Sequence, residues 1–193
     1  MRQQRQTYRD LRSMEHLRKN WKLIAQDARQ MMMKLEEQAT VNTRPKLWDD
    51  VSNLQSKKQL DVRGQWLCGP AGGNGWLNYG LIVDDEPIPE NCQECIWTYR
   101  LLMESGLNIK VAGFSWLRPN ASIPEHQDPN EETVYHLGLI VPSGSRCYVQ
   151  TQCQKMIHYE AEVLTFDDRH LHSAHNETDE ERVILYLLVH NDV

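Results

Sequence analysis

The stretch IKVAGFSWLRPNASIPEHQDPNEETVYHLGLIVP, residues 109–142, decides the fold that this sequence predicts. It holds two apolar runs of strand length, residues 109–117 and 133–142, on either side of a polar loop rich in proline and asparagine. Short apolar runs separated by such turns are typical of antiparallel sheets. The stretch therefore predicts an antiparallel sandwich or jelly roll.

The same pattern continues beyond residue 142. After the turn SGS come three further runs of strand length: RCYVQTQ at 146–152, EVLTFDD at 162–168 and RVILYLLVHN at 182–191. The sequence shows no internal repeat. From residue 108 onward we therefore expect a series of antiparallel strands.

The N-terminal part predicts one long helix over residues 7–39, because apolar side chains recur there in alternating steps of three and four. The resulting stripe consists of Met14, Leu17, Trp21, Ile24, Ala28, Met31 and Leu35. We expect the stripe to pack on the rest of the domain; the alternative is a short coiled coil that forms a homodimer. The motif NTRP at 42–45 ends this unit. The predicted domains are thus a helical segment, residues 1–45, and a jelly-roll domain, residues 46–193.

Residues 46–95 are less regular. The glycine-rich CGPAGGNGW, residues 68–76, lacks the ending of a phosphate-binding loop and predicts a structural turn. The segment CQECIWTYRLLMES, residues 92–105, predicts a helix that ends at Gly106. Helices in the first half and strands in the second predict an α+β fold.

The bulk composition is that of a soluble globular protein. Of the 193 residues, 40% are hydrophobic and 25% charged, and no apolar run has the length of a membrane span. Residues 1–35 carry a net charge of +6 in a chain whose net charge is −6, so the acidic remainder argues against a nucleic-acid partner. Five cysteines without a secretory signal predict reduced thiols in the cytoplasm, and the single CxxC lacks a second pair for zinc.

Histidine and aspartate side chains suggest a metal site. His126 and Asp128 are two residues apart, which places both on one face of an extended segment. A third ligand can come from FDDRHLHSAHNE, which offers His170, His172 and His175. Two histidines and one carboxylate form the facial triad that holds Fe(II) with open positions for oxygen chemistry. A polar turn between two prolines is the alternative that local sequence leaves open.

Arg182 opens the apolar strand RVILYLLV and is expected to point inward with Ile184 and Tyr186. A buried arginine is costly unless an anion pairs with it, and a dicarboxylate co-substrate would supply one. The alternative is an arginine at a strand end that reaches water or pairs with Glu180 or Glu181.

Together, GFSWLRPNASIPEHQDP, YHLGLIVP and VLTFDDRHLHSAHNETDEERVILYLL resemble the aspartyl/asparaginyl β-hydroxylase family over residues 91–189. LRKNWKLIAQDA is similar to the N-terminal helix of that family. The resemblance implies a double-stranded β-helix, a cupin-like jelly roll with N-terminal helices packed on it. It also implies an oxygenase that uses Fe(II), the co-substrate 2-oxoglutarate and O2.

The resemblance assigns the metal ligands residue by residue. His126 and His172 match the two histidine ligands of iron, and the spacing from FDD favours His172 over His170 and His175. Asp128 matches a carboxylate ligand of bacterial relatives, including acyl-chain hydroxylases of lipid A, where the peptidyl hydroxylases of the animal secretory pathway have glycine. The chain is therefore similar to the branch with a full triad.

The resemblance also implies contacts with the co-substrate. Arg182 and Ser115 match residues that hold the distal carboxylate of 2-oxoglutarate, and His136 matches a further co-substrate contact. Val134 departs from the pattern, because the family often has arginine at this position, which puts one co-substrate or substrate contact in doubt. His158 is expected to be an ordinary surface histidine.

The function implied is hydroxylation of an unactivated carbon, foremost the β-carbon of aspartate or asparagine in a peptide or protein. A lipid acyl chain or a small molecule is the alternative substrate. A jelly-roll binding module without catalytic activity is the alternative outside the enzymes, and the intact set of ligands argues against it.

Overall fold

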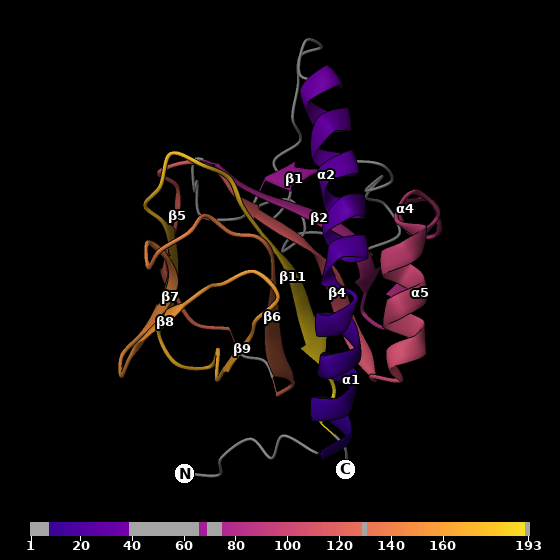
Figure 1. Cartoon of the computed structure of the whole chain (residues 1–193). Coiled ribbons are helices and arrows are strands. Elements are labelled where there is room, and N and C mark those ends of the chain that lie inside the picture. The colour runs from indigo at the N-terminus through magenta and orange to yellow at the C-terminus, as the bar shows by residue number, and fades with distance from the viewer. Residues whose placement is uncertain (1–7, 39–65, 69–74, 129–130, 192–193) are drawn as a thin grey trace, which may run out of the picture.

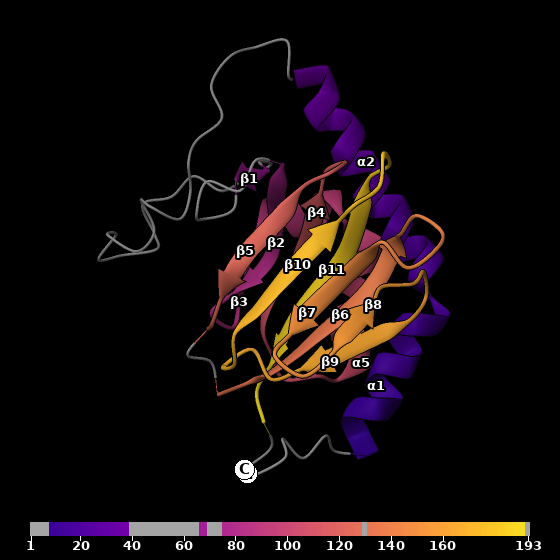
Figure 2. The same cartoon turned by 90° about the vertical axis from the view of Figure 1, so that its left-hand side faces the viewer.

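The computed structural model describes residues 8–38, 66–68, 75–128 and 131–191, and these form two antiparallel sheets with helices outside the larger one (Figures 1 and 2). The larger sheet has the order β1-β2-β4-β11-β6-β9, with β3 paired to β2, and the smaller has the order β5-β10-β7-β8. The strands of the larger sheet are β1 (Leu67–Cys68), β2 (Trp76–Val83), β3 (Glu86–Pro87), β4 (Ile109–Leu117), β6 (Thr133–Ile140), β9 (Val163–Phe166) and β11 (Arg182–Val189). Those of the smaller sheet are β5 (Ser122–His126), β7 (Cys147–Thr151), β8 (Lys155–Ile157) and β10 (His172–Asn176). The predicted α+β double-stranded β-helix is confirmed.

The two faces of the larger sheet have different partners, because successive side chains of a strand point to opposite sides. One face packs against the helices and includes the buried Phe114, Leu137 and Leu185. The other face looks toward the smaller sheet, which lies on the side away from the helices in Figure 1. The apolar core on that inner side is small and includes Leu117 and Val149. The interior of the barrel therefore has room for polar side chains.

The helices are α1 (Tyr8–Lys19), α2 (Trp21–Gln38), α4 (Pro89–Glu94) and α5 (Ile96–Ser105). The prediction of one helix over residues 7–39 is wrong, because the helix breaks at Asn20. The Asn20 side chain donates a hydrogen bond to the His16 carbonyl at 2.9 Å, while its backbone N–H bonds Leu17 in a tighter turn at 3.1 Å. Asparagine breaks helices in this way because its side chain competes for backbone groups. The helix predicted over residues 92–105 ends at Gly106 as expected, with φ at 68°, but it is interrupted at Cys95, which separates α4 from α5.

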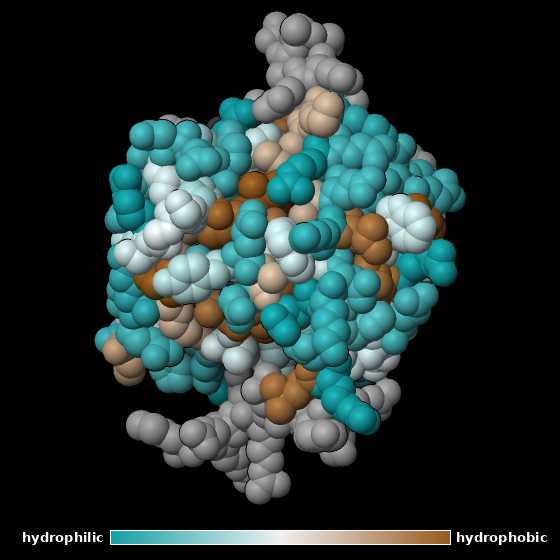
Figure 3. Space-filling view, viewed as in Figure 1, coloured by the Kyte–Doolittle hydropathy of each residue, from teal (hydrophilic) through white to brown (hydrophobic). Residues whose placement is uncertain are grey.

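The apolar stripe of α1 and α2 packs on the domain, as expected. Leu17, Ile24 and Ala28 have no exposed surface and belong to the main core. Hydrophilic residues predominate where the two helices face outward (Figure 3). This stripe is therefore not free to form a coiled-coil seam, and a homodimer through α1 and α2 stays a prediction. The predicted end of the unit at 42–45, and with it the domain boundary, lies outside the described residues.

Six strands were not predicted, among them β1 and β3, which have only two residues each. β5 lies inside the segment that was expected to be a loop, residues 118–132. The sequence did not predict it because it is a short edge strand that contains a proline and points few apolar groups inward. β10 has the polar sequence HSAHN, β8 has only three residues, and β2 falls in the segment expected to be irregular.

No described helix is long and apolar enough to cross a membrane.

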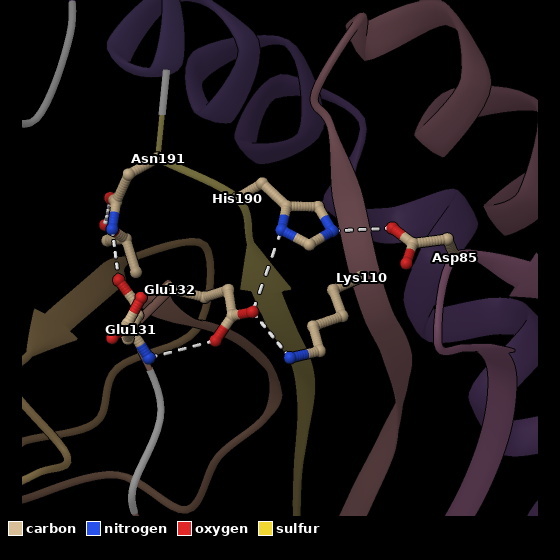
Figure 4. A network of polar contacts seen from close by, with 7 residues as sticks. Asp85, Lys110, Glu131, Glu132, His190 and Asn191 are labelled. Carbon is tan, nitrogen blue, oxygen red and sulfur yellow. Dashed lines mark hydrogen bonds and ion pairs between the residues drawn. The ribbon is translucent and has the colours of Figure 1, made fainter. Parts of the chain in front are cut away.

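A polar network fixes the C-terminal end of β11 (Figure 4). His190 contacts Asp85 at 2.6 Å on one side and Glu132 at 3.7 Å on the other. Glu132 in turn pairs with Lys110 at 2.5 Å, and the Asn191 side chain donates to the Glu131 carbonyl. Together these contacts tie β11 to the start of β4 and to the loop before β6.

Candidate metal centre and co-substrate wall

Three predicted ligands meet at one end of the smaller sheet. His126 ends β5, His172 begins β10, and the two residues are paired across the strands. Their rings lie 4.2 Å apart between centroids, and His126 Nε2 is 3.8 Å from Asp128 Oδ2. One ligand atom from each of the three residues lies within 4.8 Å of the others. This is the arrangement of donor atoms that a single metal ion requires.

The backbone orients both imidazoles toward the same point. His126 Nδ1 lies 2.7 Å from the Pro124 carbonyl oxygen, and His172 Nδ1 lies 2.9 Å from the His170 carbonyl oxygen. An Nδ1–H donated to a carbonyl leaves Nε2 as the free ligand atom, which is the usual support for a metal-bound histidine. Burial lowers the pKa of His172, which favours the neutral form that binds metal. Two imidazole nitrogens and one carboxylate oxygen fit Fe(II).

The two other candidate histidines point elsewhere. His170 pairs with Asp167 at 3.5 Å and is exposed. His175 Nε2 contacts Ser173 Oγ at 2.9 Å, and its odd spacing from His172 puts it on the opposite face of β10. The structure therefore brings His172, rather than His170 or His175, to His126.

Arg182 lies inside the barrel, and no carboxylate of the described residues pairs with it. Its side chain is only 1% exposed, its Nη1 lies 3.4 Å from the Ser115 carbonyl oxygen, and its Nε has no partner among the described residues. The alternative of pairing with a neighbouring glutamate fails for Glu181, which instead accepts from the Trp116 indole at 2.5 Å. Burial lowers the pKa of Arg182 to about 10. A buried cation with free donors fits an anionic co-substrate.

Polar groups beside Arg182 add further hydrogen-bond donors inside the barrel. Together, Arg182, Ser115, Asn78 and His136 form the candidate co-substrate wall. The Ser115 hydroxyl accepts from the Trp76 indole at 3.0 Å, which leaves its own proton free to donate. Asn78 is the cross-strand neighbour of Ser115, and its Nδ2 is buried without a partner among the described residues. Sequence reasoning missed Asn78 because it did not predict β2. Two free donors next to a buried guanidinium form a set of groups suited to a carboxylate.

His136 also faces the barrel interior, and a second histidine, His158, lies against its ring. Its Nδ1 is 3.2 Å from Nε2 of His158, and both rings are buried. The expectation that His158 lies at the surface is wrong, since it is 1% exposed. Burial, and after it the positive charge of Arg182, lowers the pKa of His136 to about 3 and that of His158 well below its ordinary value. Both imidazoles are therefore neutral at physiological pH.

Apolar groups separate the metal end from the co-substrate wall. Phe166 contacts His136 at 5.2 Å and His172 at 5.1 Å between ring centroids. Val134, at the position where the family often has arginine, is buried and pairs with Phe166 across the strands. Phe166 and Val134 therefore supply apolar surface beside His136 and His172.

The CxxC motif takes no part in this site. Cys92 lies in α4 and Cys95 directly follows it, and both are buried free thiols. Burial raises the pKa of Cys92 to about 11 and raises that of Cys95 as well. Because the thiolate is the reactive and metal-binding form, these cysteines are structural.

The fold is thus a double-stranded β-helix that gathers two histidines and an aspartate at one end and holds inside the barrel an arginine with no carboxylate partner among the described residues. A family model described as aspartyl/asparaginyl beta-hydroxylase matches residues 18–191. The chain belongs to this family.

Curated relatives share part of their length with this chain. Aspartate beta-hydroxylase domain-containing protein 2 of Homo sapiens is 32% identical over 124 residues, which cover 60% of this chain and 32% of the relative. Ornithine lipid ester-linked acyl 2-hydroxylase of Rhizobium tropici is 30% identical over 114 residues, which cover 58% of this chain and 40% of the relative. The matched region thus spans about a third of the length of the first relative and two fifths of the second.

Solved structures resemble the barrel at low sequence identity. An oxidoreductase of the 2OG-Fe(II) oxygenase family from Burkholderia pseudomallei matches with a TM-score of 0.46 and 13% identity, covering 68% of this chain and 75% of that one. An oxalate decarboxylase, itself described as predicted, from Thermotoga maritima matches with a TM-score of 0.43 and 13% identity, covering 65% of this chain and 90% of that one.

Proposed function

We propose that this protein is a dioxygenase that depends on Fe(II) and 2-oxoglutarate and hydroxylates an unactivated carbon. The observation that carries the proposal is Arg182, which has no carboxylate partner among the described residues and lies inside the same barrel that brings His126, Asp128 and His172 together. A buried cation without a carboxylate partner costs free energy until an anion arrives, which supports an anionic co-substrate.

The residues divide the work in the following way. Nε2 of His126, Nε2 of His172 and a carboxylate oxygen of Asp128 would hold Fe(II), which supplies the activation of dioxygen when bound. Arg182 and Ser115 would bind the distal carboxylate of 2-oxoglutarate through charge-assisted hydrogen bonds. His136 would make a further contact with the co-substrate, and Phe166 would exclude water from the space between the two ends.

For the substrate we propose a peptide or protein, hydroxylated at the β-carbon of aspartate or asparagine. Support comes from the family and from the name of the human relative. A lipid acyl chain is the second candidate, because the Rhizobium tropici relative is named as an acyl hydroxylase and the wall at Val134 is apolar. Four described cysteines are free thiols, which supports the proposal of a reducing, cytoplasmic setting.

Turnover and metal binding test the proposal together. Purified protein with Fe(II), ascorbate and 2-oxoglutarate should release succinate, slowly without substrate and faster with it. His126→Ala should lose stoichiometric binding of Fe(II), while His170→Ala serves as the matched control and should keep it. Wild-type protein that neither binds the metal nor forms succinate would refute the proposed function.

A mass-spectrometric screen separates the two substrate classes. Peptides containing aspartate or asparagine are incubated beside acyl-chain substrates, and a gain of one oxygen is read in each. Oxygen gain on acyl substrates alone would replace the peptide proposal with the lipid one.

A further inference from the structure

His158 is a buried polar residue to which the proposed chemistry assigns no role. It follows β8, and its backbone N–H donates to the Cys147 carbonyl at 2.8 Å. Its side chain reaches the barrel interior and contacts the ring of His136. A buried imidazole that touches a ligand-facing residue is a candidate for positioning that residue.

The loop that carries His158 is held tightly against β6. The Gly138 N–H donates to the Glu162 carbonyl at 3.0 Å, and the Ala161 N–H donates to the Gly138 carbonyl at the same distance. A side chain at Gly138 would overlap the carbonyl oxygen of Tyr159, so glycine lets the loop approach. His158 is therefore fixed relative to β6, the strand that carries His136.

The geometry of the two rings is that of a hydrogen bond. Their planes differ by only 16°, and their centroids lie 5.4 Å apart. That separation is what an in-plane N···N contact of 3.2 Å gives once the two ring radii are added. The donor N–H of one ring therefore points along the lone pair of the other.

When two neutral imidazoles share a hydrogen bond, one of the two contacting nitrogens carries a proton and the other accepts it. Two arrangements of the protons are then possible. If His136 donates from Nδ1, then His158 carries its proton on Nδ1, where no described acceptor lies, and His136 presents a bare Nε2 to the interior. If His158 donates from Nε2, its Nδ1 keeps only an unused lone pair, and His136 presents an Nε2–H, an atom that is not among the fully buried atoms without a partner in the described residues. A buried N–H without an acceptor is rarer in proteins than an unused lone pair.

We propose that His158 is a positioning residue that holds His136 as the Nε2–H tautomer, so that His136 offers a hydrogen-bond donor to an anionic co-substrate. This role rests on the proposed function, since it supposes that 2-oxoglutarate lies against the wall formed with Arg182. A bare Nε2 would repel a carboxylate there, whereas an Nε2–H binds it.

Ring-nitrogen NMR of the metal-free full chain, labelled with ¹⁵N-histidine, reads the tautomer directly. We expect His136 to be protonated at Nε2 alone in the wild type and in His158→Gln, whose amide N–H can donate in place of the imidazole. His158→Met, of similar size but without a donor, should give averaged shifts of both tautomers. Protonation of His136 on Nδ1 in the wild type would overturn the proposal.

Binding of 2-oxoglutarate to the protein loaded with redox-inert Mn(II) gives a second reading, by calorimetry. His158→Met should raise the Kd about tenfold, the effect of one lost hydrogen bond to a charged group. His158→Gln should stay close to the wild type, and equal loss in both variants would refute a role for the donated proton. Wild-type protein that binds no 2-oxoglutarate would refute the proposed function and the co-substrate contact, while the NMR spectrum would still decide whether His158 sets the tautomer.

Discussion

Replacement of Arg182 by methionine should stabilise the ligand-free protein while it removes binding of the co-substrate. Burial lowers the pKa of this guanidinium from 12.5 to about 10. At 1.36 kcal/mol for each pKa unit, the charged form is disfavoured by about 3 kcal/mol in the folded state. Because the folded pKa lies below the unfolded one, this cost is fully present at pH 7 and is relieved only as the pH rises through 10. Methionine keeps most of the side-chain volume and removes the charge.

We expect Arg182→Met to gain about 2 kcal/mol in the free energy of unfolding, which corresponds to a rise in Tm of about 4–8 °C for a chain of this size. Differential scanning calorimetry of the metal-free protein measures it. Arg146→Met makes the same change at an exposed position and should shift the free energy by less than about 0.5 kcal/mol.

The same scan with Mn(II) and 2-oxoglutarate completes the test. Ligand at a hundredfold excess over its Kd should stabilise the wild type by about 2.7 kcal/mol and leave Arg182→Met unchanged. A variant that melts several degrees below the wild type, or that still responds to 2-oxoglutarate, would show that Arg182 is a structural cation rather than an anion receptor.

Three further changes probe the scaffold. Gly138→Ala should cost about 2 kcal/mol in urea unfolding, because the added methyl overlaps the Tyr159 carbonyl; an unchanged midpoint would mean that the loop yields. Ile24→Ala should cost about 3 kcal/mol in the same assay, and a negligible loss would contradict packing of α2 on the sheet. Burial alone would raise the pKa of Glu132, but hydrogen bonds, with that from Lys110 foremost, outweigh it and lower the pKa. Glu132→Gln should therefore lose about 1 kcal/mol at pH 7, and the difference from wild type should vanish in melts recorded well below pH 4.5.

The strands that form the frame of the fold could be predicted from sequence, because their burial leaves an apolar pattern. Residues 109–117 were predicted as a strand and are β4, and the runs at 133–142 and 182–191 contain β6 and β11. β5 and β10 could not be predicted in this way. They carry the histidines of the candidate metal site. Polar side chains at such positions interrupt the apolar pattern by which a strand is predicted.

The site itself was predictable where spacing constrains it. The separation of two places His126 and Asp128 on one face of an extended segment, and the apolar strand predicts a costly buried Arg182, but the assignment of their roles needed the resemblance to the family. Asn78 and His158 carry no such signal, because each depends on a cross-strand neighbour or a loop that only the three-dimensional fold supplies. The break at Asn20 is likewise a choice between two hydrogen-bonding patterns, and the apolar stripe runs through it undisturbed.

The position of β11 has a consequence for the order of folding. β11 lies between β4 and β6 near the centre of the larger sheet, yet it is synthesised after every other strand of both sheets. Until it arrives, β4 and β6 expose unpaired edges, and the sheet can close only through contacts of long sequence separation, which fold slowly. Arg182 enters the barrel with the same strand. A nascent chain therefore completes its larger sheet and places Arg182 in the barrel in the same step, so an incompletely folded chain lacks the residue proposed to bind the co-substrate.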